Sequence, residues 1–262
     1  MQKETQPIPC RLCGERPTSE KSHIIPDFVG RRAKAAGKNR LITLKGRWVF
    51  AQDTLKLPFL CEVCEDRFGN KLEGPFSRTW FGPYPNIPST PPDALAVRFY
   101  LSVSWRVLRY LIEDSQIPGA YIADAHATEA FMRRYLNSAD RDPPEFNSYV
   151  LYASDFDGLL EAPQQELLRL TPGFGMVLFD EDYAHFLSTK MPTVVSLIGP
   201  FIHVLELQPA AAHPDRNWGN WSSFRLIAGQ SCPRGAPPAQ LTRWLAKLLG
   251  THRDDFKDDQ LY

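Results

Sequence analysis

The spacing of apolar residues predicts helices in the C-terminal two thirds of the chain. Residues 93–113 hold a long set of apolar positions one helical turn apart, and Asp93 is suited to cap the N-terminus of this helix. We expect a second helix over residues 121–136. A third covers residues 240–249, with leucines on one side and basic residues on the other. The apolar positions of the first helix are Phe99, Val103, Val107 and Leu111, and those of the third are Leu241, Leu245 and Leu248.

Short apolar runs predict β-strands over most of the remaining C-terminal part. They are found at residues 149–152, 175–179, 194–198, 202–207 and 224–227. Because helices and strands occur here in separate runs, we expect an α+β fold. Hydrophobic residues make up 43% of the 262 residues, which is enough for a sizeable core.

The first 74 residues follow a different pattern. Asp27 can cap a short helix that extends to residue 36. Two apolar stretches, 41–44 and 48–50, flank a Lys45-Gly46 turn and predict a small hairpin. A further helix is expected after the second cysteine pair, because three apolar residues follow one another at spacings of four. These residues are Cys64, Phe68 and Leu72.

Prolines divide the two regions. Residues 75–92 contain six prolines, at positions 75, 83, 85, 88, 91 and 92. Proline lacks a backbone donor and has a fixed φ, so we expect neither a helix nor a central strand to continue through this stretch. The predicted organisation is a first unit at 1–74, a linker at 75–92 and a mixed α+β unit at 93–262.

Four of the five cysteines form two CxxC pairs, Cys10 with Cys13 and Cys61 with Cys64. Each pair presents two sulfurs to one metal, so the two pairs together predict a tetrahedral zinc site. A site with four protein ligands has no open position for substrate, and the zinc is therefore expected to be structural. The fifth cysteine, Cys232, is expected to be a free thiol.

A histidine lies between the cysteine pairs, in the sequence Lys21-Ser22-His23-Ile24-Ile25-Pro26. The second pair stands in Leu60-Cys61-Glu62-Val63-Cys64-Glu65, followed by Phe68 and Glu73. This arrangement resembles the HNH endonuclease superfamily, the ββα-metal finger nucleases. It is most similar to a bacterial subgroup with Ser-His-Ile-Ile-Pro and Leu-Cys-x-x-Cys-Glu motifs. The resemblance is confined to residues 1–74.

The resemblance implies a catalytic role for His23 as the general base that deprotonates the attacking water. It also implies a catalytic Mg²⁺ or Mn²⁺, for which Glu65 and Asp66 are the expected ligands because such ions prefer oxygen donors. Ser22 stands where many superfamily members have a metal-binding residue. In the subgroup a serine at this position is normal.

A basic stretch follows the histidine, although the formal net charge of the chain is zero. No acidic residue occurs between residues 28 and 52, so this region is suited to contact nucleic-acid phosphates. The expected contacts are Arg31, Arg32, Lys34, Arg40, Lys45 and Arg47. The competing interpretation is an ordinary solvated surface. Nothing in the stretch indicates recognition of specific bases.

Two main hypotheses of function remain open. The first is an HNH-like endonuclease that cuts DNA with Mg²⁺ or Mn²⁺. For such an enzyme the resemblance suggests a role in phage defence, and residues 93–262 would supply control, specificity or a partner surface. The second is a degenerate zinc module that binds nucleic acid or a protein without cleavage, which Ser22 favours. A weaker third hypothesis is a subunit active only within a complex. The polar start of the chain and the lack of a long apolar run predict a soluble cytoplasmic protein without membrane contact.

Overall fold

The computed structural model describes residues 7–19, 22–36, 41–44, 48–81, 93–138, 148–179, 191–207 and 239–250. Over these residues the chain is mixed helix and sheet, which confirms the predicted α+β class. The predicted strand at 224–227 lies outside the described residues. No helix in the described part of the chain is long and apolar enough to cross a membrane.

The N-terminal part contains short strands and helices around the cysteine pairs. Strand β1 (Ser22–His23) pairs antiparallel with β4 (Lys56–Leu57). The predicted hairpin is present as the antiparallel pair of β2 (Leu41–Leu44) and β3 (Trp48–Ala51). The predicted helix after Pro26 is α1 (Asp27–Ala36).

The helix after the second cysteine pair extends further than the prolines suggested. It begins as α2 (Glu62–Phe68) and continues through a π-helical turn at Gly69–Glu73, α3 (Gly74–Phe76) and a second π-helical turn at Ser77–Phe81. The prediction that helix stops at Pro75 was therefore wrong over residues 75–81. Pro75 lies in the first turn of α3, where a residue without an N–H group is tolerated. Residues 82–92 lie outside the described part.

A four-stranded antiparallel sheet forms the centre of the C-terminal part, in the order β5-β8-β7-β6. Its strands are β5 (Ser148–Tyr152), β6 (Gly173–Phe179), β7 (Met191–Ile198) and β8 (Phe201–Glu206). The tight turn between β7 and β8 contains Gly199 at φ +62°. A Cβ at this position would lie 2.6 Å from Cζ of Phe81, so the turn packs directly on the second π-helical turn.

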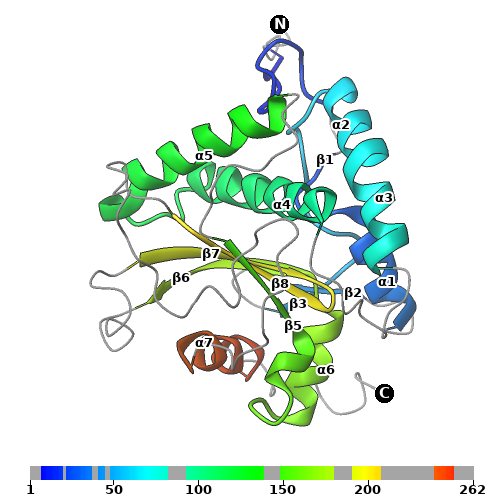
Figure 1. Ribbon diagram of the computed structural model, residues 1–262, viewed down its shortest axis with the longest axis vertical. Coiled ribbons are helices and arrows are strands. Elements are labelled where there is room, and N and C mark those ends of the chain that lie inside the picture. The colour runs from blue at the N-terminus through cyan, green and yellow to red at the C-terminus, as the bar shows by residue number, and fades with distance from the viewer. Residues whose placement is uncertain are drawn as a thin grey trace, which may run out of the picture.

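Helices cover both faces of the sheet, which gives three layers (Figure 1). Helices α4 (Ala94–Glu113) and α5 (Ile122–Asn137) belong to one outer layer, and α6 (Ala162–Leu170) and α7 (Ala239–Gly250) belong to the other side. Alternate residues of β7 and β8 face the two layers, as the period of a strand requires. Val194, Ile198, Phe201 and Leu205 join the cluster that contains α4, whereas Val195, Leu197, Ile202 and Val204 join the cluster that contains α7.

A small polar group is buried between α4 and the sheet. The Oγ of Ser104 lies 2.5 Å from Nδ1 of His203 and 3.3 Å from Oγ of Ser196. The imidazole of His203 stacks on the ring of Tyr100 at a centroid distance of 5.4 Å. Burial lowers the pKa of His203 from 6.5 to about 3, so this histidine is neutral in the folded protein.

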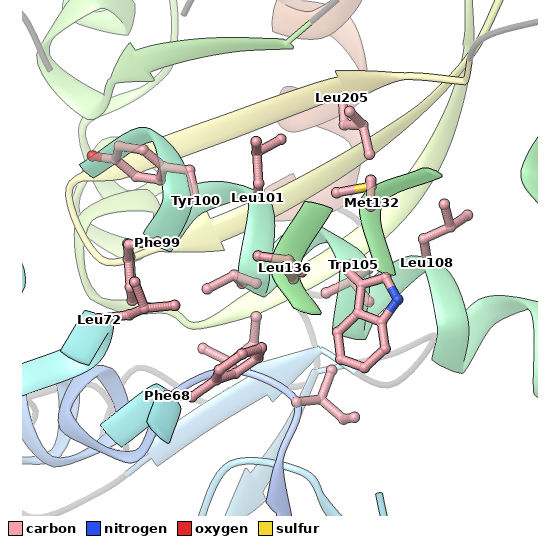
Figure 2. Packing of buried hydrophobic residues seen from close by; sticks show 14 of the residues in the cluster. Phe68, Leu72, Phe99, Tyr100, Leu101, Trp105, Leu108, Met132, Leu136 and Leu205 are labelled. Carbon is pink, nitrogen blue, oxygen red and sulfur yellow. The ribbon is translucent and has the colours of Figure 1, made fainter. Parts of the chain in front are cut away.

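One hydrophobic cluster joins the N-terminal part to α4, α5 and the sheet. Phe76 stacks on Phe99 of α4 at 3.8 Å between ring centroids, and both Phe59 and Phe68 contact the indole of Trp105 edge-on. Figure 2 shows Phe68 packed beside α4 and α5 in this cluster. Within the described residues, the N-terminal side chains share a core with α4 and do not form a separate one. The division at residues 74 and 92 into functional units stays a prediction.

Candidate functional site

The two cysteine pairs come together near the N-terminus. The sulfurs of Cys10, Cys13, Cys61 and Cys64 all lie within 4.8 Å of one another, and those of Cys13 and Cys61 are 3.9 Å apart. None of the four forms a disulfide. The first pair is held in a tight turn that Gly14 closes at φ +73°, with its N–H bonded to the Cys10 carbonyl at 2.9 Å. The second pair lies at the start of α2, where Cys61 is the N-cap residue.

The electrostatics of this cluster suit a cation. Burial alone would raise the pKa of Cys10, but hydrogen bonds from the backbone of Cys13, Cys61 and Leu12 lower it to about 7. Burial and the neighbouring sulfurs raise the pKa of Cys64, because a second negative charge is costly beside the first. A bound cation would remove that cost. The four cysteines could therefore bind a metal such as zinc.

The backbone of His23 is fixed from two sides. His23 pairs with Lys56 across the β1–β4 ladder, and the next residue, Ile24, donates its N–H to the carbonyl of Leu55 at 3.0 Å. From α4, Nη1 of Arg106 donates to the carbonyl oxygen of His23 at 2.9 Å. Arg106 is only 1% exposed and forms an ion pair with Glu73 at 2.8 Å. The position of His23 therefore depends on the contact between the N-terminal part and α4.

The imidazole of His23 faces two carboxylates. Its Nε2 lies 3.8 Å from Oδ1 of Asp27, the first residue of α1, and 3.5 Å from Oδ1 of Asp53, which follows β3. These distances are at or beyond the limit for a hydrogen bond, and Nε2 is buried without a hydrogen-bond partner. Burial lowers the pKa of His23 and the charge of Lys56 acts in the same direction, and together they outweigh the carboxylates of Asp53 and Asp27, which raise it. A neutral imidazole can accept a proton or bind a metal.

The other oxygens of the two carboxylates are paired with cations. Oδ2 of Asp27 forms an ion pair with Arg31, and Oδ2 of Asp53 accepts from Nζ of Lys56 at 2.6 Å. The N–H of Thr54 donates to Oδ1 of Asp53 at 2.8 Å. Burial would raise the pKa of Asp53, but its hydrogen bonds to Lys56 and Thr54 outweigh burial and lower it. Asp53 is therefore ionised at neutral pH.

Glu65 and Asp66, the magnesium ligands expected from the sequence, do not join His23 in a cluster of metal-binding groups among the described residues. Burial raises the pKa of Glu65, while the charge of Arg106 and a hydrogen bond with the Ser22 hydroxyl oppose that rise. Asp66 is exposed. Their roles as catalytic ligands stay predictions.

Ser22 has a structural role. Its side chain is fully buried, and its Oγ accepts a hydrogen bond from the N–H of Leu60 at 2.8 Å. This bond joins β1 to the segment that leads into the second cysteine pair. Ser22 therefore links the histidine strand to the cysteine cluster.

The predicted phosphate contacts fall into three groups. Arg31 is 69% exposed although it is paired with Asp27, and Lys34 is partly buried on α1. Arg32 donates to the carbonyl oxygen of Phe81 and lies over its ring at 5.2 Å, so it holds the second π-helical turn. Phosphate binding by these residues stays a prediction. Arg40, Lys45 and Arg47 lie outside the described residues.

Asp27 and Asp53 are the residues that the sequence analysis did not place in the site. Asp27 follows His23 by four positions and was interpreted only as a helix cap. Asp53 is brought to His23 by the turn between β3 and β4, which no local pattern indicates.

Comparison of the chain with protein-family profiles, curated proteins and solved structures gave no match.

Proposed function

We propose that the protein is a metal-dependent endonuclease of the HNH-like kind that hydrolyses phosphodiester bonds in DNA. The observation that carries the proposal is the His23 site. A partly buried imidazole, whose pKa burial lowers, faces the carboxylates of Asp27 and Asp53, 3.8 and 3.5 Å away, on a segment tied to a four-cysteine cluster. Hydrolytic sites need such a group to activate water next to a cation.

In this proposal the cysteine cluster holds a structural zinc. Four thiolates leave no position for substrate, and binding contributes free energy to folding. The hydrogen bond from Leu60 to Ser22 ties the strand of His23 to this cluster, and the bond from Arg106 to the His23 carbonyl holds the same strand from α4. The zinc would therefore act on the reaction indirectly, by fixing the strand that carries His23.

His23 activates the attacking water, either by accepting its proton directly, as the resemblance implies, or by helping to hold a cation that polarises it. Exposed basic side chains beside the site, such as Arg31, would contact the phosphate backbone. A role in phage defence is a further expectation of the resemblance. Residues 93–262, which the resemblance does not cover, would supply control, specificity or a partner surface.

The alternative is a zinc module that binds nucleic acid or a protein partner without cutting. Two observations favour it: Ser22 is used in a structural hydrogen bond, and both carboxylates beside His23 already pair with Arg31 and Lys56. This alternative predicts that removal of the imidazole leaves binding unchanged.

A plasmid-cleavage assay separates the two. We expect the zinc-loaded protein to nick supercoiled DNA with Mg²⁺ or Mn²⁺, and His23→Ala to lose nicking while it keeps one zinc per chain. His126→Ala, which removes an exposed histidine on α5, is the matched control and should cut normally. The absence of nicking by the wild-type protein with either metal would refute the nuclease and favour the binding module.

A further inference from the structure

We propose that His23, Asp27 and Asp53 form a second metal site, which binds one divalent cation apart from the cysteine cluster. The three residues come from β1, the start of α1 and the turn after β3, and their ligand atoms all lie within 4.8 Å of one another. The proposal rests on the proposed function for its purpose, because it identifies where the hydrolytic cation binds. Cation binding itself is measurable without any cleavage.

The distances fit a shared cation better than direct contacts. Nε2 of His23 lies 3.5 Å from one carboxylate oxygen and 3.8 Å from the other. Ligands held at about 2.1–2.4 Å from one ion lie about 3.0–3.9 Å from each other, depending on the geometry. An imidazole and two carboxylates that were only hydrogen-bonded would be closer, at roughly 2.7–3.0 Å.

The hydrogen bonding of the three side chains also suits a cation. Nε2 is buried and has no hydrogen-bond partner, which costs free energy unless something else occupies it. Each carboxylate directs Oδ2 to a basic side chain and Oδ1 to the imidazole. Oδ1 of Asp53 also accepts from the N–H of Thr54, which uses one lone pair and leaves the second for a cation. The arrangement therefore presents one nitrogen and two oxygens to a single point.

The ligand set indicates the class of ion. Carboxylate oxygens suit Mg²⁺ and Mn²⁺, and an imidazole favours Mn²⁺ or another transition ion over Mg²⁺. Three protein ligands leave open positions for water and a phosphate oxygen. Under this inference His23 serves the reaction as a ligand through Nε2, and the cation takes over the polarisation of water.

The backbone around the site is already rigid. The hydroxyl of Thr54 donates to the carbonyl of Ile25 at 3.1 Å, and its N–H holds Asp53, so the turn that carries this carboxylate is tied to the histidine segment. Arg106 holds the His23 carbonyl from the other side. Ligands fixed in this way lose little conformational freedom when an ion binds.

Titration with Mn²⁺ tests the inference directly. The full-length protein is loaded with one zinc per chain, and the free Mn²⁺ signal is followed by electron paramagnetic resonance. We expect one Mn²⁺ per chain, with affinity reduced on the order of tenfold or more in Asp27→Asn, Asp53→Asn and His23→Ala. Glu166→Gln, on the exposed face of α6, is the control and should bind Mn²⁺ like wild type.

Asparagine keeps the shape of aspartate, and zinc content with far-UV circular dichroism checks that each variant is folded. Three results would overturn the site: no Mn²⁺ bound, affinity unchanged in both aspartate variants, or affinity lost in Glu65→Gln and kept in Asp27→Asn. Mn²⁺ bound at this site without any DNA cleavage would support the inference and refute the nuclease. Cleavage with Mn²⁺ affinity independent of Asp27 and Asp53 would refute the site alone.

Discussion

Replacement of Arg106 by leucine should destabilise the protein strongly, although this residue lies on α4 and belongs neither to the cysteine cluster nor to the His23 site. The guanidinium is 1% exposed and donates to three acceptors. These are the carbonyl of Ser102 at 3.2 Å, the carbonyl of His23 at 2.9 Å and the carboxylate of Glu73 at 2.8 Å. Leucine keeps part of the apolar stem and removes every donor.

The expected cost follows from the groups left behind. Breaking a buried ion pair by removing one partner costs roughly 3–5 kcal/mol, and an unpaired buried carbonyl costs about 1–3 kcal/mol. The Glu73 side chain is 20% exposed, so water would compensate part of its loss. We therefore expect the free energy of unfolding to fall by about 3–5 kcal/mol in total.

Urea unfolding of the zinc-loaded protein measures this loss. At an m-value of about 3 kcal/mol/M, the midpoint should fall by about 1–1.7 M. Arg169→Leu is the matched control, because its ion pair with Asp157 is on the surface, with 35% and 49% of the two side chains exposed. Surface pairs contribute about 0–1 kcal/mol, so the control should change little.

A double variant sharpens the test. Arg106→Leu combined with Glu73→Leu replaces the buried pair by apolar side chains, so it should be more stable than Arg106→Leu alone. A loss below about 1 kcal/mol in Arg106→Leu, or a double variant less stable than the single one, would refute the reasoning. Either result would mean that Arg106 does not hold the N-terminal part against α4.

Two further predictions concern the sheet. Gly199→Ala should lower the free energy of unfolding by about 2–4 kcal/mol in a urea titration, because φ is +62° and the new Cβ would lie 2.6 Å from Phe81. Gly119, which has open space around it, should accept alanine at a cost within about 0.5 kcal/mol. Equal losses of stability in the two variants would contradict the packing of Gly199 on Phe81. His203 has a pKa of about 3 in the folded protein against 6.5 ordinarily, so below pH 6.5 the unfolded chain takes up a proton that the folded protein does not. The contribution of the neutral, buried imidazole to stability is therefore complete above pH 6.5 and is lost as pH falls towards 3. The free energy of unfolding should fall by about 1.4 kcal/mol per pH unit in that window, and the difference in this free energy between wild type and His203→Gln should follow the same slope. A difference in stability that does not depend on pH would refute a neutral buried imidazole.

The sequence predicted best what short-range spacing determines. The periodic apolar positions of α4 and α7 and the runs of β5 to β8 define their elements locally, and the structure confirms all of them. The two cysteine pairs were predictable for the same reason, because each CxxC pair fixes two sulfurs within one turn. Their meeting in one cluster was predicted from metal chemistry, since four thiolates suit one tetrahedral ion. Pro75 misled the prediction, since local propensity does not register that Phe76, Trp80 and Phe81 gain enough from burial to keep the chain helical.

The histidine site was only half predictable. The motif around His23 identified the imidazole, but the groups that face it are determined by tertiary structure. Asp53 reaches His23 only because the β3–β4 turn folds back on β1. Phosphate binding by Arg32 stays a prediction, and the bond that this residue donates to the carbonyl of Phe81 is one that no charge pattern could indicate.

The shared core has a consequence for metal affinity. Phe59 and Phe68, which lie beside the second cysteine pair in the sequence, pack on Trp105 of α4, so we expect the cysteine cluster to form together with the docking of α4. A metal bound by the four cysteines would bind the folded state selectively, and its apparent dissociation constant would include the free energy of folding. Destabilising substitutions in the layer of α4 and α5, far from any sulfur, would therefore weaken metal binding by thermodynamic linkage. Tight metal binding would in turn stabilise the folded protein and offset part of the stability that such substitutions remove.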